Sequence, residues 1–547
     1  MIIKTTDQAI SALTCARSCV HRFTTALLAG AILLTVAISA AAREDQTLFD
    51  QYEINTGNTN HQTVLPGFFL GGETAELAVV HVVDTGAQRI DMYGLVDDAW
   101  EQVLKSSLGG EVLFVDVINI AGSDRLLSFE NDAINWFDSA TESERLLFEV
   151  PFSFQATSGT EIPHVDITRD LNHDGLDDLV LPEQDGFWIA TQLASGAFSE
   201  LTKLGPPEPL LDQSAFDDSR TYREVGINRL TTPWYLSRVH EMDFNLDSRS
   251  DLVFWNRDHF EVYYQDSSGQ FSTDGDTFTT DVEFEADGIH SYVFGYDGEN
   301  MFSLLLGFRA KCKRTALHSF RDMNGDGISD LVTQSIEGRS LLRQRSSYAV
   351  HFGSPTSNGV AFASDASMIL QPQASAEGGS PLGYSLGWLE DFDGDGQIDF
   401  GYGRVNTGIT GFFSALVVNS ISIDIEFYKI VDGVYPESPN GLLKIKPDRE
   451  FFLGGRGPFF PTVMLGDVNG DERADLLVGE NWEELTVYTG VSSPALLASE
   501  PRIIPAAMTA NGEQDARVVN LNRDNKQDVT IHHPNAEPQK LVVLVAH

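Results

Sequence analysis

The segment Asp322–Val332 reads DMNGDGISDLV and places acidic residues at fixed intervals directly before an apolar run. The pattern recurs as DLNHDGLDDLV from Asp170, DFNLDSRSDLV from Asp243, DFDGDGQIDFG from Asp391, DVNGDERADLL from Asp467 and, in a weaker copy, NLNRDNKQDVT from Asn520. Its common form is D-x-[DN]-x-D-G-x-x-D followed by a strand-like run. A constant loop at uneven spacing indicates one supersecondary unit with variable surface connections.

Short apolar runs in pairs follow these loops. LVFW is followed by FEVYY after the Asp243 loop, and Leu476–Val478 by LTVYTG after the Asp467 loop. Runs of this length, separated by Gly, Asn or Asp, are typical of antiparallel strands, and no long amphipathic helix is evident. Segments from Gly67 and from Glu111 share the apolar rhythm without the acids. The sequence therefore predicts an all-β propeller with eight blades, or seven if one acid-poor unit is not a full blade.

The closure of the ring is predicted from the two ends of the repeat region. The chain ends soon after the last loop, at KLVVLVAH, without room for another strand. The segment TLFDQYEIN, which begins at Thr47, has no unit of its own. We expect it to supply the outer strand of the last blade, because this hides the edges of the sheet.

The repeated loop has the chemistry of a calcium site. Calcium prefers six to eight oxygens from carboxylates and carbonyls. Side chains at positions 1, 3, 5 and 9 and the carbonyl at position 7 supply them, while a glycine at position 6 permits the bend. The ligand set predicted on this basis is Asp170, Asn172, Asp174, Leu176 and Asp178; Asp243, Asn245, Asp247 and Asp251; Asp322, Asn324, Asp326, Ile328 and Asp330; Asp391, Asp393, Asp395, Gln397 and Asp399; and Asp467, Asn469, Asp471, Arg473 and Asp475.

The loops are unequal, and two other interpretations compete with a calcium loop that leads into a strand. The Asp391 loop has four carboxylates and its bend glycine, whereas Ser248 and Glu472 replace that glycine in two other loops and the Asn520 copy has only two carboxylates. An EF-hand is excluded because position 12 is never the required Glu and lies in a strand-like run. Acidic turns without metal remain the alternative.

These residues resemble a known family. The loops, with lead-ins such as GYSLGWLEDFDGDG and TVMLGDVNGDERADLLVG, look like the FG-GAP or VCBS repeat. That resemblance implies a calcium-binding propeller of the integrin α-chain type, from about Gly67 to the C-terminus. It also implies a surface or exported protein, often one that mediates adhesion or sugar binding. No partner follows from it.

Composition and the N-terminus indicate where the protein acts. The 547 residues include 36 Lys and Arg against 80 Asp and Glu, a net charge of −44, which disfavours nucleic acid and anionic lipid as partners. Lys4, Arg17 and Arg22 precede the apolar run Ala26–Ala42, the layout of a secretory leader cleaved after Ala42; an uncleaved anchor is the alternative. We expect an exported protein, periplasmic, secreted or at the cell surface, with a single propeller domain from 43 to 547 and without membrane insertion after cleavage.

Other motifs are weaker. Gly383–Gly387 matches the G-x-S-x-G elbow of serine hydrolases, but a metal loop follows it where that elbow needs a helix. His532 and His533 are expected in a solvated turn, Cys312 as an inert thiol, and the basic cluster from Arg309 to Arg314 as a pairing surface.

Three functions remain open at this stage. The leading hypothesis is a non-catalytic, calcium-stabilised module that binds a protein or a glycan. The alternatives are a polysaccharide-active hydrolase or lyase at one mouth of the ring, and a structural subunit of an envelope complex. Acidic residues outside the metal loops that line one mouth would favour the enzyme, because sugar cleavage needs a pair of carboxylates.

Overall fold

A computed structural model describes residues 48–59, 61–109, 111–130, 132–150, 162–183, 186–205, 239–256, 258–284, 313–338, 345–373, 380–381, 387–405, 423–445, 462–492, 494–509 and 515–547. The chain divides into two compact units, Met1–Phe49 and Asp50–His547, and only the second is described below. Every regular element with assigned bounds in the described ranges is a β-strand. The same ranges hold no helix with the length and apolar character needed to span a bilayer.

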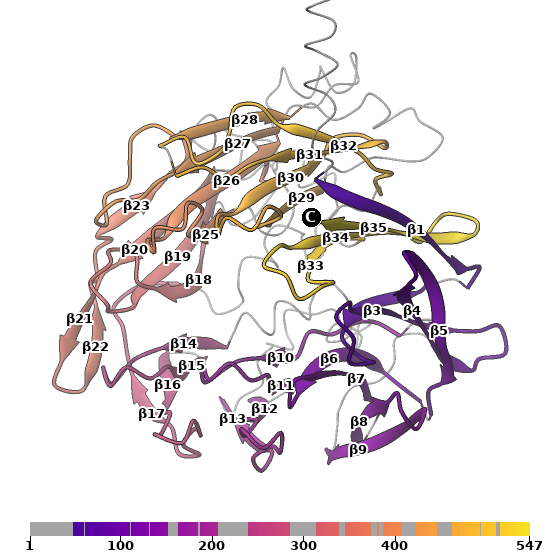
Figure 1. Cartoon of the computed structure of the whole chain (residues 1–547). Helices are drawn as coiled ribbons and strands as arrows, with labels where there is room; N and C mark the ends of the chain where they lie inside the picture. The colour runs from indigo at the N-terminus through magenta and orange to yellow at the C-terminus, as the bar shows by residue number, and fades with distance from the viewer. Residues whose placement is uncertain are drawn as a thin grey trace, which may run out of the picture. The chain divides into compact units, whose positions relative to one another are not determined.

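In the described residues of the second unit, eight antiparallel sheets of four or five strands each form one blade of a β-propeller (Figure 1). Blades 1 to 4 are β2 (Thr63–Gly67), β3 (Glu76–Val82), β4 (Gln88–Val96) and β5 (Ala99–Ser107); β6 (Phe114–Ile120), β7 (Ser123–Phe129), β8 (Ala133–Asp138) and β9 (Ser143–Glu149); β10 (Thr168–Arg169), β11 (Asp178–Glu183), β12 (Gly186–Ala190) and β13 (Thr202–Leu204); and β14 (His240–Met242), β15 (Asp251–Asn256), β16 (His259–Tyr263) and β17 (Asp276–Phe278).

The remaining four blades follow the same order. They are β18 (Lys313–Arg321), β19 (Asp330–Glu337), β20 (Arg345–His351) and β23 (Met368–Leu370); β24 (Ser380–Pro381) and β25 (Gly387–Glu390), which both pair with β26 (Asp399–Val405), then β27 (Ile423–Tyr428) and β28 (Gly441–Ile445); β29 (Thr462–Gly466), β30 (Asp475–Gly479), β31 (Glu484–Tyr488) and β32 (Arg502–Pro505); and β33 (Ala516–Val519), β34 (Asp528–His533), β35 (Gln539–Ala546) and β1 (Phe49–Gly57). A hairpin of β21 (Gly353–Thr356) and β22 (Gly359–Phe362) projects from blade 5.

Core residues explain why the second strand of a blade reads as a continuous apolar run. In β11, Leu179 and Leu181 pack against blade 2, whereas Val180 between them packs against blade 4. Successive side chains of a strand point to opposite faces, so a sheet between two neighbours needs apolar residues on both. The apolar run after each loop is therefore the signature of a sheet that is buried on both faces.

The ring closes through β1. This strand pairs with β35, on the opposite edge of the sheet from β33, so the N-terminal segment provides the outer strand of blade 8 as expected. A core that includes Leu541 and Val543 of blade 8 with Leu77 and Val79 of blade 1 joins the last blade to the first. The eight blades predicted from the repeats are confirmed.

The sequence placed the start of the first blade too late. Its first strand, β2, ends at Gly67, where the predicted unit began, and pairs with β3 from Thr63 onward. Pro66 lies within β2, and a proline inside a short run argues against a strand unless that strand lies at an edge of its sheet. β2 is such an edge strand.

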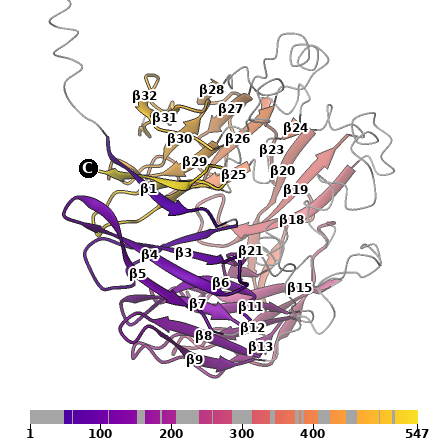
Figure 2. The same ribbon diagram turned by 90° about the vertical axis from the view of Figure 1, so that its right-hand side faces the viewer.

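First strands converge on the centre of the ring. β6 contacts β2 and β10, β14 contacts β18, and β29 contacts β33, although each pair belongs to different blades. Figure 2 shows one blade, β6 to β9, with its strands side by side. In blades 3 to 8 the acidic loop joins the first strand to the second, so all six loops lie at the same end of their blades.

A candidate metal centre in the repeated loops

In the five loops that begin with an aspartate, this first carboxylate accepts hydrogen bonds from backbone N–H groups within the turn. In the loop that begins at Asp322, Oδ1 of this residue accepts the N–H of Asp326 at 3.2 Å and Oδ2 accepts the N–H of Gly327 at 2.7 Å. Gly327 has φ of 81°, a backbone conformation that glycine adopts without steric cost. Glu472 and Ser248 occupy the same position with φ of 64° and 68°, so these two loops make the predicted bend at the cost of side-chain strain.

The ninth residue of each loop is a fully buried aspartate, and its carboxylate is held mainly by the backbone. In blade 5, Oδ2 of Asp330 accepts the N–H of Met323 at 3.0 Å and Oδ1 accepts the N–H of Gly353 at 2.8 Å. Asp178, Asp251, Asp475 and Asp528 make the same two kinds of bond in their own blades. The position predicted as a metal ligand therefore also pins the loop to the strands of its own blade.

Burial makes these carboxylates costly to ionise. Desolvation, which outweighs the backbone hydrogen bonds, raises the pKa of Asp178 and of Asp399 to about 7. The same cause raises the pKa of Asp251, Asp330 and Asp475 to about 6. A cation close to the ninth residue would therefore favour its ionised form.

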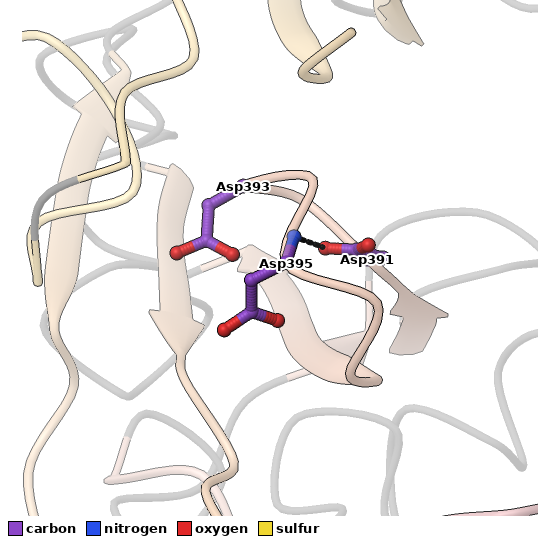
Figure 3. Close-up of side chains that lie close together, drawn as sticks. All are labelled: Asp391, Asp393 and Asp395. Carbon is purple, nitrogen blue, oxygen red and sulfur yellow. Dashed lines mark hydrogen bonds between the residues drawn. The ribbon is translucent and has the colours of Figure 1, made fainter.

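Blade 6 brings three carboxylates together. Oxygens of Asp391, Asp393 and Asp395 lie within 4.8 Å of one another, the one such acidic group that a metal ion could use among the described residues. In Figure 3 the carboxylates of Asp393 and Asp395 lie on the same side of the turn, while Asp391 accepts the N–H of Asp395. The loop with most carboxylates in the sequence is thus the one that clusters them in space.

Two oxygens at this loop have no donor. Oδ1 of Asp393 and Oδ1 of Asp399 are buried and lack a hydrogen-bond partner. A buried carboxylate oxygen without a partner is costly, and calcium binds such oxygens. The Asp391 loop therefore fits a calcium ion on the chemistry of its donor set, with Asp391, Asp393, Asp395 and Asp399 as side-chain ligands.

A lysine already lies against this cluster. Nζ of Lys429 donates to Oδ2 of Asp393 and, at 2.7 Å, to Oδ2 of Asp395. Burial acts to lower the pKa of Lys429, but these two hydrogen bonds outweigh it and raise the pKa above its ordinary value. The same lysine lowers the pKa of Asp395. The repeat pattern does not indicate Lys429, whose only signal in the sequence is a basic residue within the largely apolar run IEFYKIV.

In the other acidic loops, the carboxylate of the fifth residue has a different hydrogen-bond partner. Arg249 donates to Asp247, and Arg473 donates to Asp471 at 3.0 Å, both from position 7 of their own loop. In the loops at Asp170 and Asp322 an amide takes that place: Asn172 Nδ2 lies 3.3 Å from Asp174, and Asn324 Nδ2 lies 3.0 Å from Asp326. The five acidic loops thus fall into three with a basic side chain on the fifth residue and two with an amide.

Neighbouring loops also contact one another. The N–H of Ala474 donates to the carbonyl of Phe392 at 3.2 Å, and Asn525 Nδ2 donates to the carbonyl of Gly470 at 3.0 Å. At the Asp170 loop, Gln265 of blade 4 donates to the carbonyl of Asn172 at 2.9 Å. An ion that ordered one loop would therefore also order the edge of the next blade.

A separate polar cluster lies where first strands meet. Asp116, beside β10, accepts from His164 at 2.9 Å and from the N–H of Ile167 at 2.8 Å. The other ring nitrogen of His164 lies 3.4 Å from Nη1 of Arg517, which belongs to blade 8. Asp166 follows His164 by two residues, and desolvation, with the charge of Asp116 as the second cause, raises its pKa. Nothing in the sequence pattern indicated this cluster.

Several predicted features lie outside the described residues: the leader, Cys312, Arg309 and Lys311 of the basic cluster, and Gly383–Leu386 of the G-x-S-x-G segment. The histidine pair was placed wrongly, because His532 and His533 lie in β34 and not in a turn. Successive residues of a strand face opposite ways, and His533 Nε2 lies 3.2 Å from the carbonyl of Ala507. The pair is part of blade 8.

Comparisons with known proteins add the following. No family model matches the chain, and no curated protein matches it. Among solved structures, a Dos1 propeller is 12% identical with a TM-score of 0.38, and the match covers 91% of this chain and 95% of that one. The Vanderwaltozyma polyspora Nup133 β-propeller domain is 8% identical with a TM-score of 0.31, over 92% and 99%. The Photorhabdus luminescens Tc holotoxin pore is 12% identical with a TM-score of 0.30, over 86% of this chain, which spans 17% of the length of that one.

Proposed function

We propose that this chain is an exported β-propeller of the FG-GAP or VCBS type, stabilised by calcium, that acts as a non-catalytic binding or adhesion module for a protein or a glycan. The observation that supports calcium most strongly is the Asp391 loop, where three carboxylates lie within 4.8 Å and two buried oxygens lack a donor. The acidic loops of the other blades repeat the same backbone geometry at the same end of the ring.

Calcium would act on structure in this proposal. It would lie among the carboxylates of positions 1, 3, 5 and 9 and the carbonyl of position 7, and it would favour the ionised form of the buried ninth residue. Because the loop of blade 7 is hydrogen-bonded to the loops of blades 6 and 8, order at one of these loops would reach the next blade. The result would be a rigid end of the ring that presents the surrounding connections to a partner.

The polar cluster between first strands supports a structural role. Asp116 accepts through both oxygens, and His164 has a partner at each ring nitrogen. These contacts join residues that belong to different blades. Together they tie blade 8 to blades 2 and 3.

A glycan array tests the binding function. The full chain is applied in calcium and again in excess chelator. We expect retention of one class of glycan in calcium and its loss in chelator, with recovery when calcium returns. Equal retention in both conditions would contradict a role for calcium in binding, and turnover of the arrayed sugars would contradict the non-catalytic assignment.

One observation supports a polysaccharide-active enzyme as the second candidate. Asp166 and Glu241 lie at first strands of adjacent blades, outside the proposed ligand sets, and desolvation raises the pKa of both. A carboxyl with a raised pKa is the form that a general acid requires. Incubation with a panel of polysaccharides would decide: release of reducing ends that Asp166→Asn abolishes would establish the enzyme, and no release would leave the binding module.

A further inference from the structure

Lys429 occupies a position where the other blades with acidic loops have no basic residue. The residue that follows the ninth loop position pairs with the last residue of the third strand, as Leu331 pairs with His351 and Phe400 pairs with Tyr428. The next residue along is Lys429 in blade 6. Its counterparts, from the same register in the other acidic blades, are Thr191, Tyr264, Phe352 and Thr489.

The loop beside Lys429 also differs from the other acidic loops in how its ninth carboxylate is held. Elsewhere the residue after that counterpart donates its N–H to the ninth carboxylate, as Gly353 does to Asp330 at 2.8 Å and Gly490 to Asp475 at 2.8 Å. In blade 6 the matching oxygen, Oδ1 of Asp399, is buried and has no partner. The ammonium group of Lys429 instead lies against Asp393 and Asp395, where its side chain is 20% exposed and that of Asp393 only 2%.

We propose that Lys429 is a built-in counter-ion that occupies the carboxylate cluster of the Asp391 loop and competes with calcium for it. This inference rests on the proposed calcium function and deepens it, because it assigns this loop a different response to metal from the loops at Asp170 and Asp322, where an amide contacts the fifth residue. The loop holds its shape in the absence of calcium and binds the ion only when Lys429 leaves.

Charge and geometry support the competition. Nζ of Lys429 donates to Oδ2 of Asp393 and to Oδ2 of Asp395, so its positive charge lies among the carboxylates that calcium would use. Hydrogen bonds between charged groups are stronger than those between neutral ones, so calcium must displace a strong partner. At the Asp322 loop the corresponding partner of Asp326 is the neutral amide of Asn324, which an ion displaces at lower cost. The number of ligands alone would give the Asp391 loop the highest calcium affinity. With Lys429 against its carboxylates, we expect the Asp391 loop to bind calcium more weakly than the Asp322 loop.

The test uses the full chain and its Lys429→Met variant, which keeps the length of the side chain and removes its charge. Bound ions are counted by native mass spectrometry, and affinities come from calorimetric titration with calcium chloride. We expect Lys429→Met to bind calcium at the Asp391 loop at least about tenfold more tightly than the unmodified protein does, because calcium then no longer has to break hydrogen bonds between charged groups. Without metal, the variant should melt at a lower temperature than the unmodified protein.

Two further variants serve as controls. Lys444→Met removes an exposed lysine from β28 of the same blade and should change neither the number of ions nor their affinity. Lys429→Met combined with Asp393→Asn should lose the tight site, which would locate it at this loop.

The outcomes separate this inference from the proposed function. If the unmodified protein binds calcium and Lys429→Met binds it with the same number and affinity, competition by Lys429 is wrong and the calcium function stands. If neither protein binds calcium at millimolar concentration, the calcium function itself is wrong and the competition with it. A tight site that survives Asp393→Asn would also overturn the assignment.

Discussion

The loops at Asp322 and Asp391 belong to adjacent blades and have the same backbone conformation. They differ in the groups that contact their carboxylates. Both use the first carboxylate to accept N–H groups of the turn, and both have a glycine with positive φ at the bend. At Asp322 the ninth residue is satisfied by two backbone donors and an amide contacts the fifth. At Asp391 the ninth residue lacks one donor and a lysine contacts the fifth.

This difference shows that the acidic residues of the loop have two roles, which the repeat pattern alone does not distinguish. The ninth residue is a buried structural acceptor in every blade that has the loop, whatever else it binds. The third and fifth residues have different partners in different loops, and we expect these partners to decide how each loop responds to a cation. Equal sequence motifs therefore need not be equal metal sites.

The largest expected effect comes from the ninth residues. Asp330→Ala removes the acceptor of two buried N–H groups, and each unsatisfied group costs about 1–3 kcal/mol, so we expect a loss of about 3 kcal/mol in the free energy of unfolding. Asp399→Ala removes only the 3.3 Å bond from Phe392 and should cost about half as much. Urea denaturation in chelator at pH 7 measures both, and a larger loss for Asp399→Ala would contradict the comparison.

The fifth residues should differ in their dependence on calcium. Asp326→Ala is expected to remove about 1–3 kcal/mol that is present only with calcium, in the range for loss of a charged ligand group. Asp395→Ala breaks a contact with Lys429 that exists without metal, so its loss should be similar in calcium and in chelator. Melting curves of both variants, each in calcium and in chelator, measure this difference. A calcium-dependent loss of stability in Asp395→Ala but not in Asp326→Ala would contradict it.

The pH dependence of the metal-free protein follows from the ninth residues. Their pKa in the folded state is raised, to about 6 for Asp330 and about 7 for Asp399, above the ordinary value of 3.8. The folded state therefore binds more protons than the unfolded chain between these values, and this contribution to stability is lost as the pH rises from about 4 to about 7.

Melting temperatures in chelator should accordingly be lower at pH 7.5 than at pH 5. Calcium should reduce this difference because it favours the ionised carboxylates. Asp330→Asn, which stays neutral, should flatten the part of the curve near pH 6. Rising stability of the metal-free protein over the same range would show that these carboxylates do not control it.

The smallest effect is expected at the last loop. Asp524 is exposed and its carboxylate accepts the N–H of Lys526 at 2.9 Å. Asp524→Ala should therefore change the free energy of unfolding by no more than about 0.5 kcal/mol, as for most surface substitutions. The change should be the same in calcium and in chelator, and a calcium-dependent loss above that of Asp326→Ala would place a working site in the closing blade.

The repeat pattern predicted the blades because its two parts have separate physical causes. The apolar run follows from a sheet that is buried on both faces, as at Leu179, Val180 and Leu181. The acids at fixed offsets follow from a turn that is closed by its own first carboxylate. Both causes are local, so both appear in the linear sequence.

Features that depend on contacts between distant residues could not be predicted in this way. Lys429 lies 34 positions from Asp395, and Arg517 lies 353 positions from His164. The second role of the ninth residue also depends on a distant donor, such as Gly353 for Asp330. The number of carboxylates ranks the loops by expected calcium affinity without taking these partners into account. β2 was not predicted as a strand, because a proline such as Pro66 argues against a strand in a short run.

Thermal unfolding of the full chain with and without calcium tests the central claim most directly. The protein is freed of metal with chelator, and melting is followed in chelator, in calcium and in magnesium at matched ionic strength. An ion that binds only the folded state, at a hundredfold excess over its Kd, stabilises it by about 2.7 kcal/mol. The account predicts that calcium raises the melting temperature clearly and magnesium does so much less. Identical melting curves in chelator and in saturating calcium would contradict it.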